Sequence, residues 1–178
     1  MDFQDVLKTY GHAVEKSRHA HVFSQGDDDN GLYLIRSGAL KAYYVSEDGK
    51  EFVKSFLLPG ESIGSLTCIL GKGSCTFGVV CLEDSVLTRI SGEDLIALSR
   101  EHLPLANAVN TMLLDLAHKK ERREYEFLCL SAEERYRRLM ERSPALFETV
   151  TQNDIARYLG ITPVALSRIK KRVEAEAG

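Results

Sequence analysis

Short segments in which hydrophobic and polar positions alternate fill most of the first 90 residues. The period-2 pattern predicts β-strands, and residues rich in Gly, Asp, Asn and Pro separate them every 8–12 positions. Five strands are expected, over residues 32–36, 39–45, 52–58, 77–82 and 86–90. Asp48-Gly49 supplies a tight turn between the second and third. Strands of this length with such frequent turns predict an antiparallel sandwich or roll.

The turns also predict which strands pair. Ser37-Gly38 is expected to close a hairpin in which residues 39–45 return along residues 32–36. Residues 77–82 and 86–90 are expected to form a later pair across residues 83–85.

Helical spacing governs the rest of the chain. Residues 3–16 predict a short amphipathic helix, and Ser91 and Pro104 mark further helix starts. A long helix is expected from Leu105 to about Phe127. Apolar residues recur along its first half at steps of three and four: Leu105, Val109, Met112, Leu113 and Leu116. Its second half, residues 118–124, is almost entirely charged.

This apolar seam has two interpretations. It can pair with the same helix of a second subunit, or it can pack on its own domain. Ser131 then opens a further helix with a capping-box sequence, and Pro144 closes it.

Residues 151–172 predict two short helices joined by a tight turn. Thr151 caps the first helix, and Gly160 stands where the chain must reverse. Thr162 caps the second, with Pro163 at its first position, where the missing N–H does no harm. This is the pattern of a helix-turn-helix, whose second helix enters the DNA major groove.

The second helix carries the charge that DNA requires. Four basic side chains and no acidic one lie between Thr162 and Val173. An ordinary helical hairpin with a solvated basic face would not need two caps and a glycine turn in so short a stretch. Seven residues are predicted to contact DNA: Ser167 and Arg168 at base edges, Thr162, Val164 and Ala165 as hydroxyl or apolar contacts, and Lys171 and Thr151 at phosphates. An HTH protein normally needs two half-site readers, which favours pairing of the long helix.

Composition and charge agree with a DNA-binding module on an acidic body. The 178 residues carry a net charge of −3. Nine Lys/Arg against seven Asp/Glu from Ser131 onward give +2, so the first 130 residues carry −5. No apolar run is long enough to span a membrane, and no secretory signal is seen, so the protein is expected in the cytoplasm. The four cysteines do not have the spacing of zinc ligands, so no metal site is expected. No catalytic motif is found, so an enzyme is not expected.

At this point the chain resembles the cyclic-AMP receptor/FNR family of bacterial transcription regulators over about residues 20–173. The similar segments are 31–38 (GLYLIRSG), 47–51 (EDGKE), 58–64 (LPGESIG), 82–85 (LEDS) and 154–162 (DIARYLGIT). The resemblance implies an α+β protein with a jelly-roll-like antiparallel β-roll over residues 1–99. A dimerisation helix over 100–127 and an all-α helix-turn-helix domain over 128–178 would follow.

The likeness is incomplete where family members bind cyclic nucleotides. Those members have a Glu after the glycine that corresponds to Gly64, and an Arg-Ser or Arg-Thr pair about ten residues later. Here Ser65 and Cys75-Thr76 stand at those places, so cyclic AMP is not expected to bind. Gly64, Ser65, Leu66, Cys75 and Thr76 remain the candidate effector pocket. No cysteine precedes Cys68, so the resemblance does not extend to members with iron–sulfur clusters, and no cofactor is expected.

The resulting hypothesis is a homodimeric regulator that binds double-stranded DNA, with an unidentified small-molecule effector and RNA polymerase as further candidate partners. The alternative is a ligand-binding or protein-interaction module of the same fold that has lost DNA readout. A flat salt dependence of DNA binding would favour that alternative.

Overall fold

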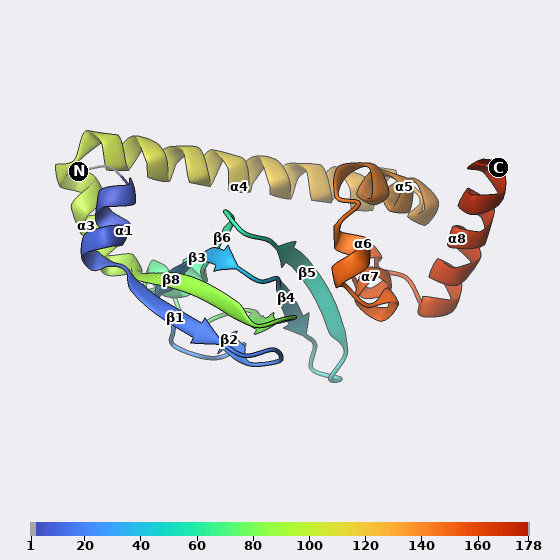
Figure 1. Ribbon diagram of the computed structural model, residues 1–178, viewed down its shortest axis with the longest axis horizontal. Coiled ribbons are helices and arrows are strands. Elements are labelled where there is room, and N and C mark those ends of the chain that lie inside the picture. Colours follow the sequence, from blue (N-terminus) through green and yellow to red (C-terminus); the bar gives the residue numbers. More distant parts are fainter. Residues whose placement is uncertain (1–2, 178) are drawn as a thin grey trace.

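The N-terminal half of the protein folds into two facing antiparallel sheets. The computed structural model describes residues 3–177 (Figure 1). One sheet has the order β1-β8-β3-β6, formed by His12–Lys16, Ser85–Ser91, Gly31–Ser37 and Ser62–Ile63. The other has the order β2-β7-β4-β5, formed by His21–Phe23, Gly78–Cys81, Leu40–Val45 and Glu51–Leu57. This is the predicted β-roll.

Alternate residues of the strands fill the space between the two sheets. Ile35 and Leu87 of the first sheet and Leu40, Val79 and Cys81 of the second are at most 1% exposed. The period-2 pattern of the sequence is therefore the inward-facing surface of a sandwich core.

Two of the predicted strand pairings are wrong. β3 lies in the first sheet and β4 in the second, so the turn at Gly38 carries the chain from one sheet to the other. β7 and β8 are likewise in different sheets, whereas the predicted turn at Asp48-Gly49 joins β4 and β5, which pair as a hairpin. Gly38 has φ 90°, and a Cβ there would lie 2.2 Å from Ser85 Oγ. A turn signal shows where the chain reverses, but it does not show in which sheet the next strand lies.

Three helices, one before the roll in sequence and two after it, close one end of the roll. α1 (Phe3–Tyr10), α3 (Gly92–Glu101) and the first turns of α4 (Leu103–Cys129) share a small core with Ile90 of β8. The predicted helix over residues 3–16 is too long, because the chain becomes β1 at His12 and pairs with β8. A single turn, α2 (Leu66–Ile69), was not predicted.

The C-terminal part is entirely helical, with α5 (Ala132–Arg142), α6 (Leu146–Thr149), α7 (Gln152–Leu159) and α8 (Pro163–Ala177). Tyr136, Leu139, Ile155, Leu159 and Leu166 form its core. The predicted capping box at Ser131 is confirmed, with the Glu134 amide donating to its hydroxyl and Glu134 accepting from its backbone. α6 is a single turn between the helix that Pro144 was predicted to close and the helix-turn-helix.

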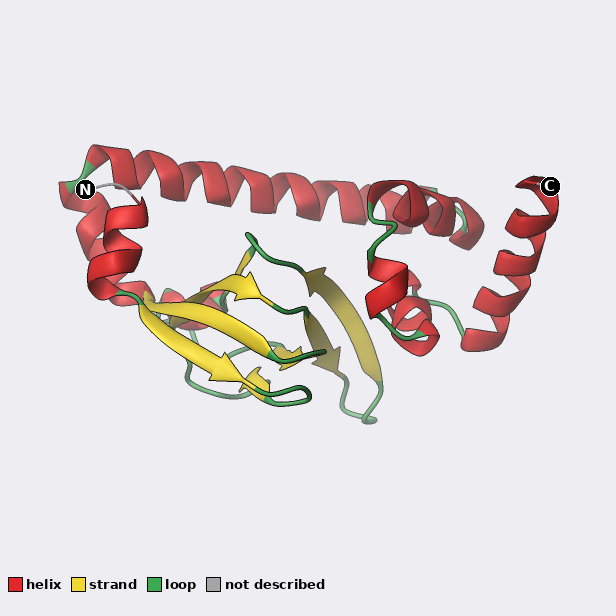
Figure 2. Cartoon of the chain, in the orientation of Figure 1, coloured by secondary structure: helices red, strands yellow, loops and turns green. Residues whose placement is uncertain are grey.

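α4 runs above the roll from α1 and α3 at one end to α5 at the other, and α8 lies beyond its C-terminal end (Figures 1 and 2). The helix therefore connects the helices at one end of the roll to the helical C-terminal part. Within residues 3–177, no helix combines the length and the apolarity needed to cross a lipid bilayer.

Candidate nucleic-acid interface

The helix-turn-helix over α7 and α8 has the predicted local structure. Thr151 Oγ1 accepts a hydrogen bond from the Asp154 amide at 3.1 Å, which caps α7. Gly160 ends α7 in the left-handed conformation, φ 69° and ψ 32°. Thr162 Oγ1 then accepts from the Ala165 amide at 3.2 Å, at the start of α8. Both caps and the glycine turn come from local chemistry alone.

α8 presents one face to its own domain and the other to solvent. Leu166 and Ile169 are buried against α5 and α7, whereas Val164 is 62% exposed. Ser167, Arg168 and Lys171 are also exposed, and their positions share one helical face with Val164 because they recur at steps of three and four. Thr151 and Thr162 are exposed beside this face, and Ala165 is half-buried.

The basic side chains of α8 are not equivalent. Arg172 forms an ion pair with Glu133 of α5 at 2.8 Å, and Lys170 is half-buried. Within the described residues, Arg168 and Lys171 have no ion pair or side-chain hydrogen bond. These two side chains are therefore free to meet an external anion.

A buried ion-pair cluster fastens α7 to the roll. Lys41 Nζ of β4 donates to Asp154 Oδ1 at 2.9 Å and to Glu51 Oε1 of β5 at 2.8 Å. Arg157 of α7 donates to the same Glu51 oxygen at 3.0 Å. Lys41 is 8% exposed, so the cluster lies out of water between two parts of the chain. Burial alone lowers the pKa of Lys41, but the two carboxylates outweigh it and hold that pKa above its ordinary value.

A second set of contacts joins the same helix to β5 and α4. The rings of Phe56 and Tyr158 are 5.3 Å apart, and Arg123 of α4 lies 4.0 Å from the Tyr158 ring centre. Arg123 also donates to the carbonyls of Val53 at 3.1 Å and of Tyr158 at 3.0 Å. One guanidinium thus bridges the roll, the long helix and the helix-turn-helix.

Of the predicted effector-pocket residues, Ser65 and Leu66 lie at the start of α2, and Cys75 lies beside Cys68 of that helix. Ser65 is fully buried, and its hydroxyl has no hydrogen-bond partner among the residues that the structure describes. The thiol of buried Cys75 donates to the Asp29 carbonyl at 3.5 Å, and Thr76 is exposed. At Gly64 a Cβ would lie 2.7 Å from the Gly31 carbonyl oxygen. Only Leu66 of the five lines the main groove of the protein.

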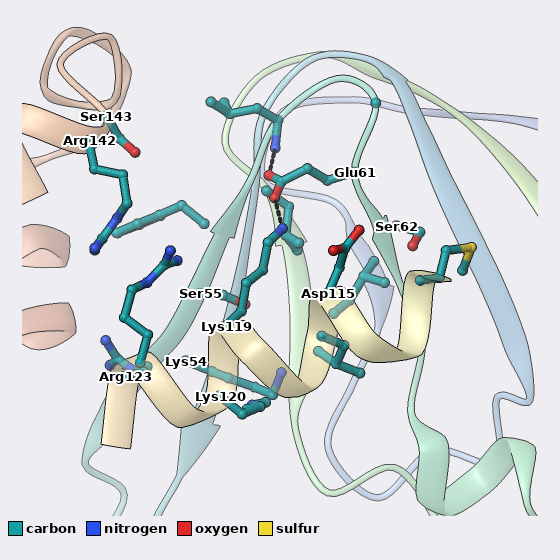
Figure 3. Close-up of a pocket in the computed structure, with 18 of the residues that line it drawn as sticks. Lys54, Ser55, Glu61, Ser62, Asp115, Lys119, Lys120, Arg123, Arg142 and Ser143 are labelled. Atoms are coloured by element: carbon teal, nitrogen blue, oxygen red, sulfur yellow. Dashed lines mark hydrogen bonds and ion pairs between the residues drawn. The ribbon is translucent and has the colours of Figure 1, made fainter. Parts of the chain in front are cut away.

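That groove, of about 580 Å³, lies between β5, β6 and the second half of α4, and it reaches α5 and α7 (Figure 3). Apolar residues line one part of it, and lysine and arginine side chains line another. Sequence reasoning missed this site. The one feature of the sequence that could have indicated it is Lys54, a charged residue in the middle of a largely apolar strand.

Only the first part of the predicted seam of α4 is buried in its own chain, and Leu113 further along is 44% exposed. Leu105 is fully buried with Val6, Ile90 and Leu95, and Val109 packs on the same cluster. Met112, Leu113 and Leu116 line the groove. The opposite face of the helix instead exposes Leu103 and Leu114 (71% each) and Leu128 (77%). These three are 11 and 14 residues apart, close to whole numbers of 3.6-residue turns, so they share one face.

Comparison with known sequences identifies the family. Residues 13–102 match the cyclic nucleotide-binding domain. The Anaerobic regulatory protein of Pasteurella multocida is 31% identical over 164 residues, which are 86% of this chain and 59% of that protein. The Fumarate and nitrate reduction regulatory protein of Escherichia coli K12 is 32% identical over 167 residues, 86% of this chain and 65% of that protein. The chain therefore spans about three fifths of the length of these relatives.

Solved structures agree in fold. FixK2 from Bradyrhizobium japonicum superposes with a TM-score of 0.78 at 17% identity, over 94% of this chain and 86% of that one. The c-di-GMP responsive regulator CLP of Xanthomonas campestris superposes with a TM-score of 0.77 at 20% identity, over 98% of this chain and 91% of that one. The β-roll, the long helix and the helical C-terminal part are thus present together in known proteins. From the match over residues 13–102, the chain belongs to the cyclic nucleotide-binding domain family.

Proposed function

We propose that this protein is a dimeric transcription regulator that binds double-stranded DNA through α8. The observation that carries the proposal is the solvent-exposed face of α8, which bears Ser167, Arg168 and Lys171 beyond a capped helix-turn-helix. A guanidinium reads guanine through two hydrogen bonds, and an ammonium group suits phosphate. In this proposal the roll of residues 1–99 receives a signal, the helix of 100–127 transmits it, and residues 128–178 bind DNA.

Arg168→Ala and Lys171→Ala test the two roles. We expect Arg168→Ala to reduce discrimination between matched and mismatched sites by about 1–3 kcal/mol. Lys171→Ala should weaken binding to all sequences alike and lower the salt slope by about one. The measurement is fluorescence anisotropy on a selected site and on single-base variants, at several salt concentrations.

Arg172→Ala serves as the control, because Glu133 already occupies that guanidinium. Equal losses on every sequence from Arg168→Ala would overturn its assignment to a base edge. A flat salt dependence of the unaltered protein would overturn DNA binding itself and leave the alternative of a module without DNA readout.

The dimer interface is proposed on the face of α4 that bears Leu103, Leu114 and Leu128. Leucines exposed along one face of a 27-residue helix suit pairing with the same helix of a second subunit. Leu105 and Val109, which the sequence pattern favoured for this role, are occupied within the subunit.

Leu114→Glu is expected to weaken the dimer at least about 100-fold, because two carboxylates would be buried beside each other on the symmetry axis. Analytical ultracentrifugation over a concentration series measures the change. Leu70→Glu, at an exposed leucine next to α2, is the matched control and should leave the dimer unchanged. Unchanged self-association of Leu114→Glu would place the interface elsewhere.

A further inference from the structure

Two of the cysteines lie against each other in the roll. The thiol of Cys68, in the single turn α2, is within hydrogen-bonding reach of the thiol of Cys75, and both sulfurs are free. The position of Cys75 is fixed by its backbone, because its amide donates to the Asp27 carbonyl at 2.8 Å and its carbonyl accepts from the Gly26 amide at 2.7 Å. The fold therefore holds two thiols as a pair.

The two thiols of this pair differ in their access to solvent. Cys68 is half-buried, whereas Cys75 is only 3% exposed. A reagent in solution can therefore reach the sulfur of Cys68 first. Cys75 is placed to attack that sulfur from inside the protein once it has reacted. This is the arrangement of an attacking and a resolving thiol.

The surroundings of Cys68 favour an uncharged sulfur. Burial, the Cys75 thiol and the carboxylates of Asp28 and Asp29 together raise the pKa of Cys68. A raised pKa makes the thiolate scarce at neutral pH, so the reaction with an external reagent is slow. The same neighbours leave the reduced pair without a stabilised thiolate, which favours the disulfide at equilibrium.

The chain between the two cysteines can adjust when a bond forms. Residues 70–74 are an exposed loop, and Gly71 (φ 64°) and Gly73 (φ 137°) adopt left-handed conformations there. A Cβ at Gly71 would meet nothing within 4 Å, so the loop has open space beside it. Two sulfurs in contact must approach to about 2.05 Å to form a disulfide. A flexible surface loop can absorb this movement, because it lies outside the packed core.

The other two cysteines provide internal comparisons. Cys81 is fully buried in the core of the roll, where burial raises its pKa and Ser85 is its hydrogen-bond partner. Cys129 is exposed at the C-terminal end of α4. One is a thiol that reagents cannot reach, and the other is a thiol that they reach freely.

We propose that Cys68 and Cys75 form a reversible disulfide by exchange with a low-molecular-weight disulfide such as oxidised glutathione. The Cys68 thiolate attacks one sulfur of the reagent, the S–S bond of the reagent breaks, and one thiol molecule leaves. The Cys75 thiolate then attacks the Cys68 sulfur of the mixed disulfide and releases the second thiol molecule. The protein sulfurs lose two electrons, the reagent gains them, and the two thiol protons end on the released molecules. This inference does not depend on DNA binding.

Oxidised glutathione is the probe, and Cys129→Ser is the background because it removes the exposed thiol. Trypsin cuts after Lys72, between the two cysteines, and places them in peptides 55–72 and 73–89. These peptides stay joined only through a disulfide. We expect mass spectrometry to find the joined pair after oxidation and the separate peptides after reduction. Because peptide 73–89 also contains Cys81, the joined pair must persist when Cys81→Ala is added. Separate peptides after oxidation of the folded protein would overturn the proposal.

An equilibrium measurement tests whether the fold favours the bond. The protein is equilibrated in mixtures of reduced and oxidised glutathione, once folded and once in urea. We expect the equilibrium constant for the disulfide to be at least about ten-fold larger in the folded protein, because only the fold keeps the thiols in contact. An equal or smaller constant in the folded protein would show that the fold opposes the bond, and would overturn the proposal.

Single variants test the order of attack. Cys75→Ser should retain one glutathione on Cys68, because no resolving thiol is left to release it. Cys68→Ser should leave Cys75 unmodified over the same period, because Cys75 is buried. Circular dichroism verifies that both variants are folded. Equally fast modification of Cys75 in Cys68→Ser would overturn the assignment of Cys68 as the attacking thiol.

The outcome is separable from that of the proposed function. Arg168→Ala should abolish sequence discrimination on DNA and leave the disulfide equilibrium unchanged. DNA binding and thiol oxidation can therefore fail independently.

Discussion

Lys41→Met is expected to lower the free energy of unfolding by about 3–4 kcal/mol and to loosen α7 from the roll. Lys41 Nζ is the shared partner of Asp154 at 2.9 Å and Glu51 at 2.8 Å, and it is nearly inaccessible to water. Methionine keeps the apolar stem, so the substitution removes the charge and little packing. Removing one partner of a buried ion pair leaves the other charges uncompensated, which is strongly destabilising.

Urea denaturation followed by circular dichroism measures this loss, and hydrogen exchange of α7 amides locates it. Because the folded-state pKa of Lys41 is raised, its stabilising contribution is fully present below about pH 10.5 and is lost only as the pH rises through the raised value. The difference in the free energy of unfolding between the variant and the parent protein should therefore be constant from pH 6 to pH 9. Lys50→Met, an exposed lysine of the β4–β5 turn, should change stability by less than about 0.5 kcal/mol. A loss that small for Lys41→Met would show that the cluster does not hold α7.

The helix-turn-helix could be predicted from the sequence because its signals are local. Thr151, Gly160 and Thr162 act on amides or turns within a few residues, so their caps and reversals do not depend on the rest of the chain. Ser131 is the same kind of signal. The strands β3, β4, β5, β7 and β8 were also predictable individually from their apolar and polar positions, whereas β1, β2 and β6 were not predicted.

Contacts between distant residues could not be predicted in this way. Asp154 is in the position of a capping residue, and the sequence gives no sign that its carboxylate also meets Lys41, 113 residues away. Leu105 has the spacing of an interface residue, but only the position of α1 and α3 shows that its own subunit covers it. The periodicity of apolar residues does not determine which sheet a strand joins or which face of a long helix stays exposed. Both depend on how the elements pack together.

Lys54→Met is expected to raise the free energy of unfolding by about 2 kcal/mol at pH 6. Burial and the neighbouring cations lower the pKa of Lys54 from its ordinary value of 10.5 to about 7 in the folded protein. At pH 6 the ammonium is charged in both states, so the folded state carries the full cost of burying it. A full conversion of this pKa difference would give about 5 kcal/mol. Water in the open groove screens part of the charge, and the expected gain is smaller for that reason.

The pH dependence of this gain identifies its cause. Between about pH 7 and pH 10.5 the folded parent releases the Lys54 proton while the unfolded chain keeps it, so the stability of the parent rises with pH. The advantage of the methionine variant should therefore shrink steadily from pH 7 to pH 10 in urea denaturation. Lys119→Met, which breaks an ion pair with Glu61 in the same groove, should give no gain at any pH. A gain for Lys54→Met that is the same at pH 6 and pH 9.5 would show that methionine merely packs better. A gain confined to low pH would show instead that the buried charge of Lys54, and not the fit of its side chain, lowers the stability of the folded protein.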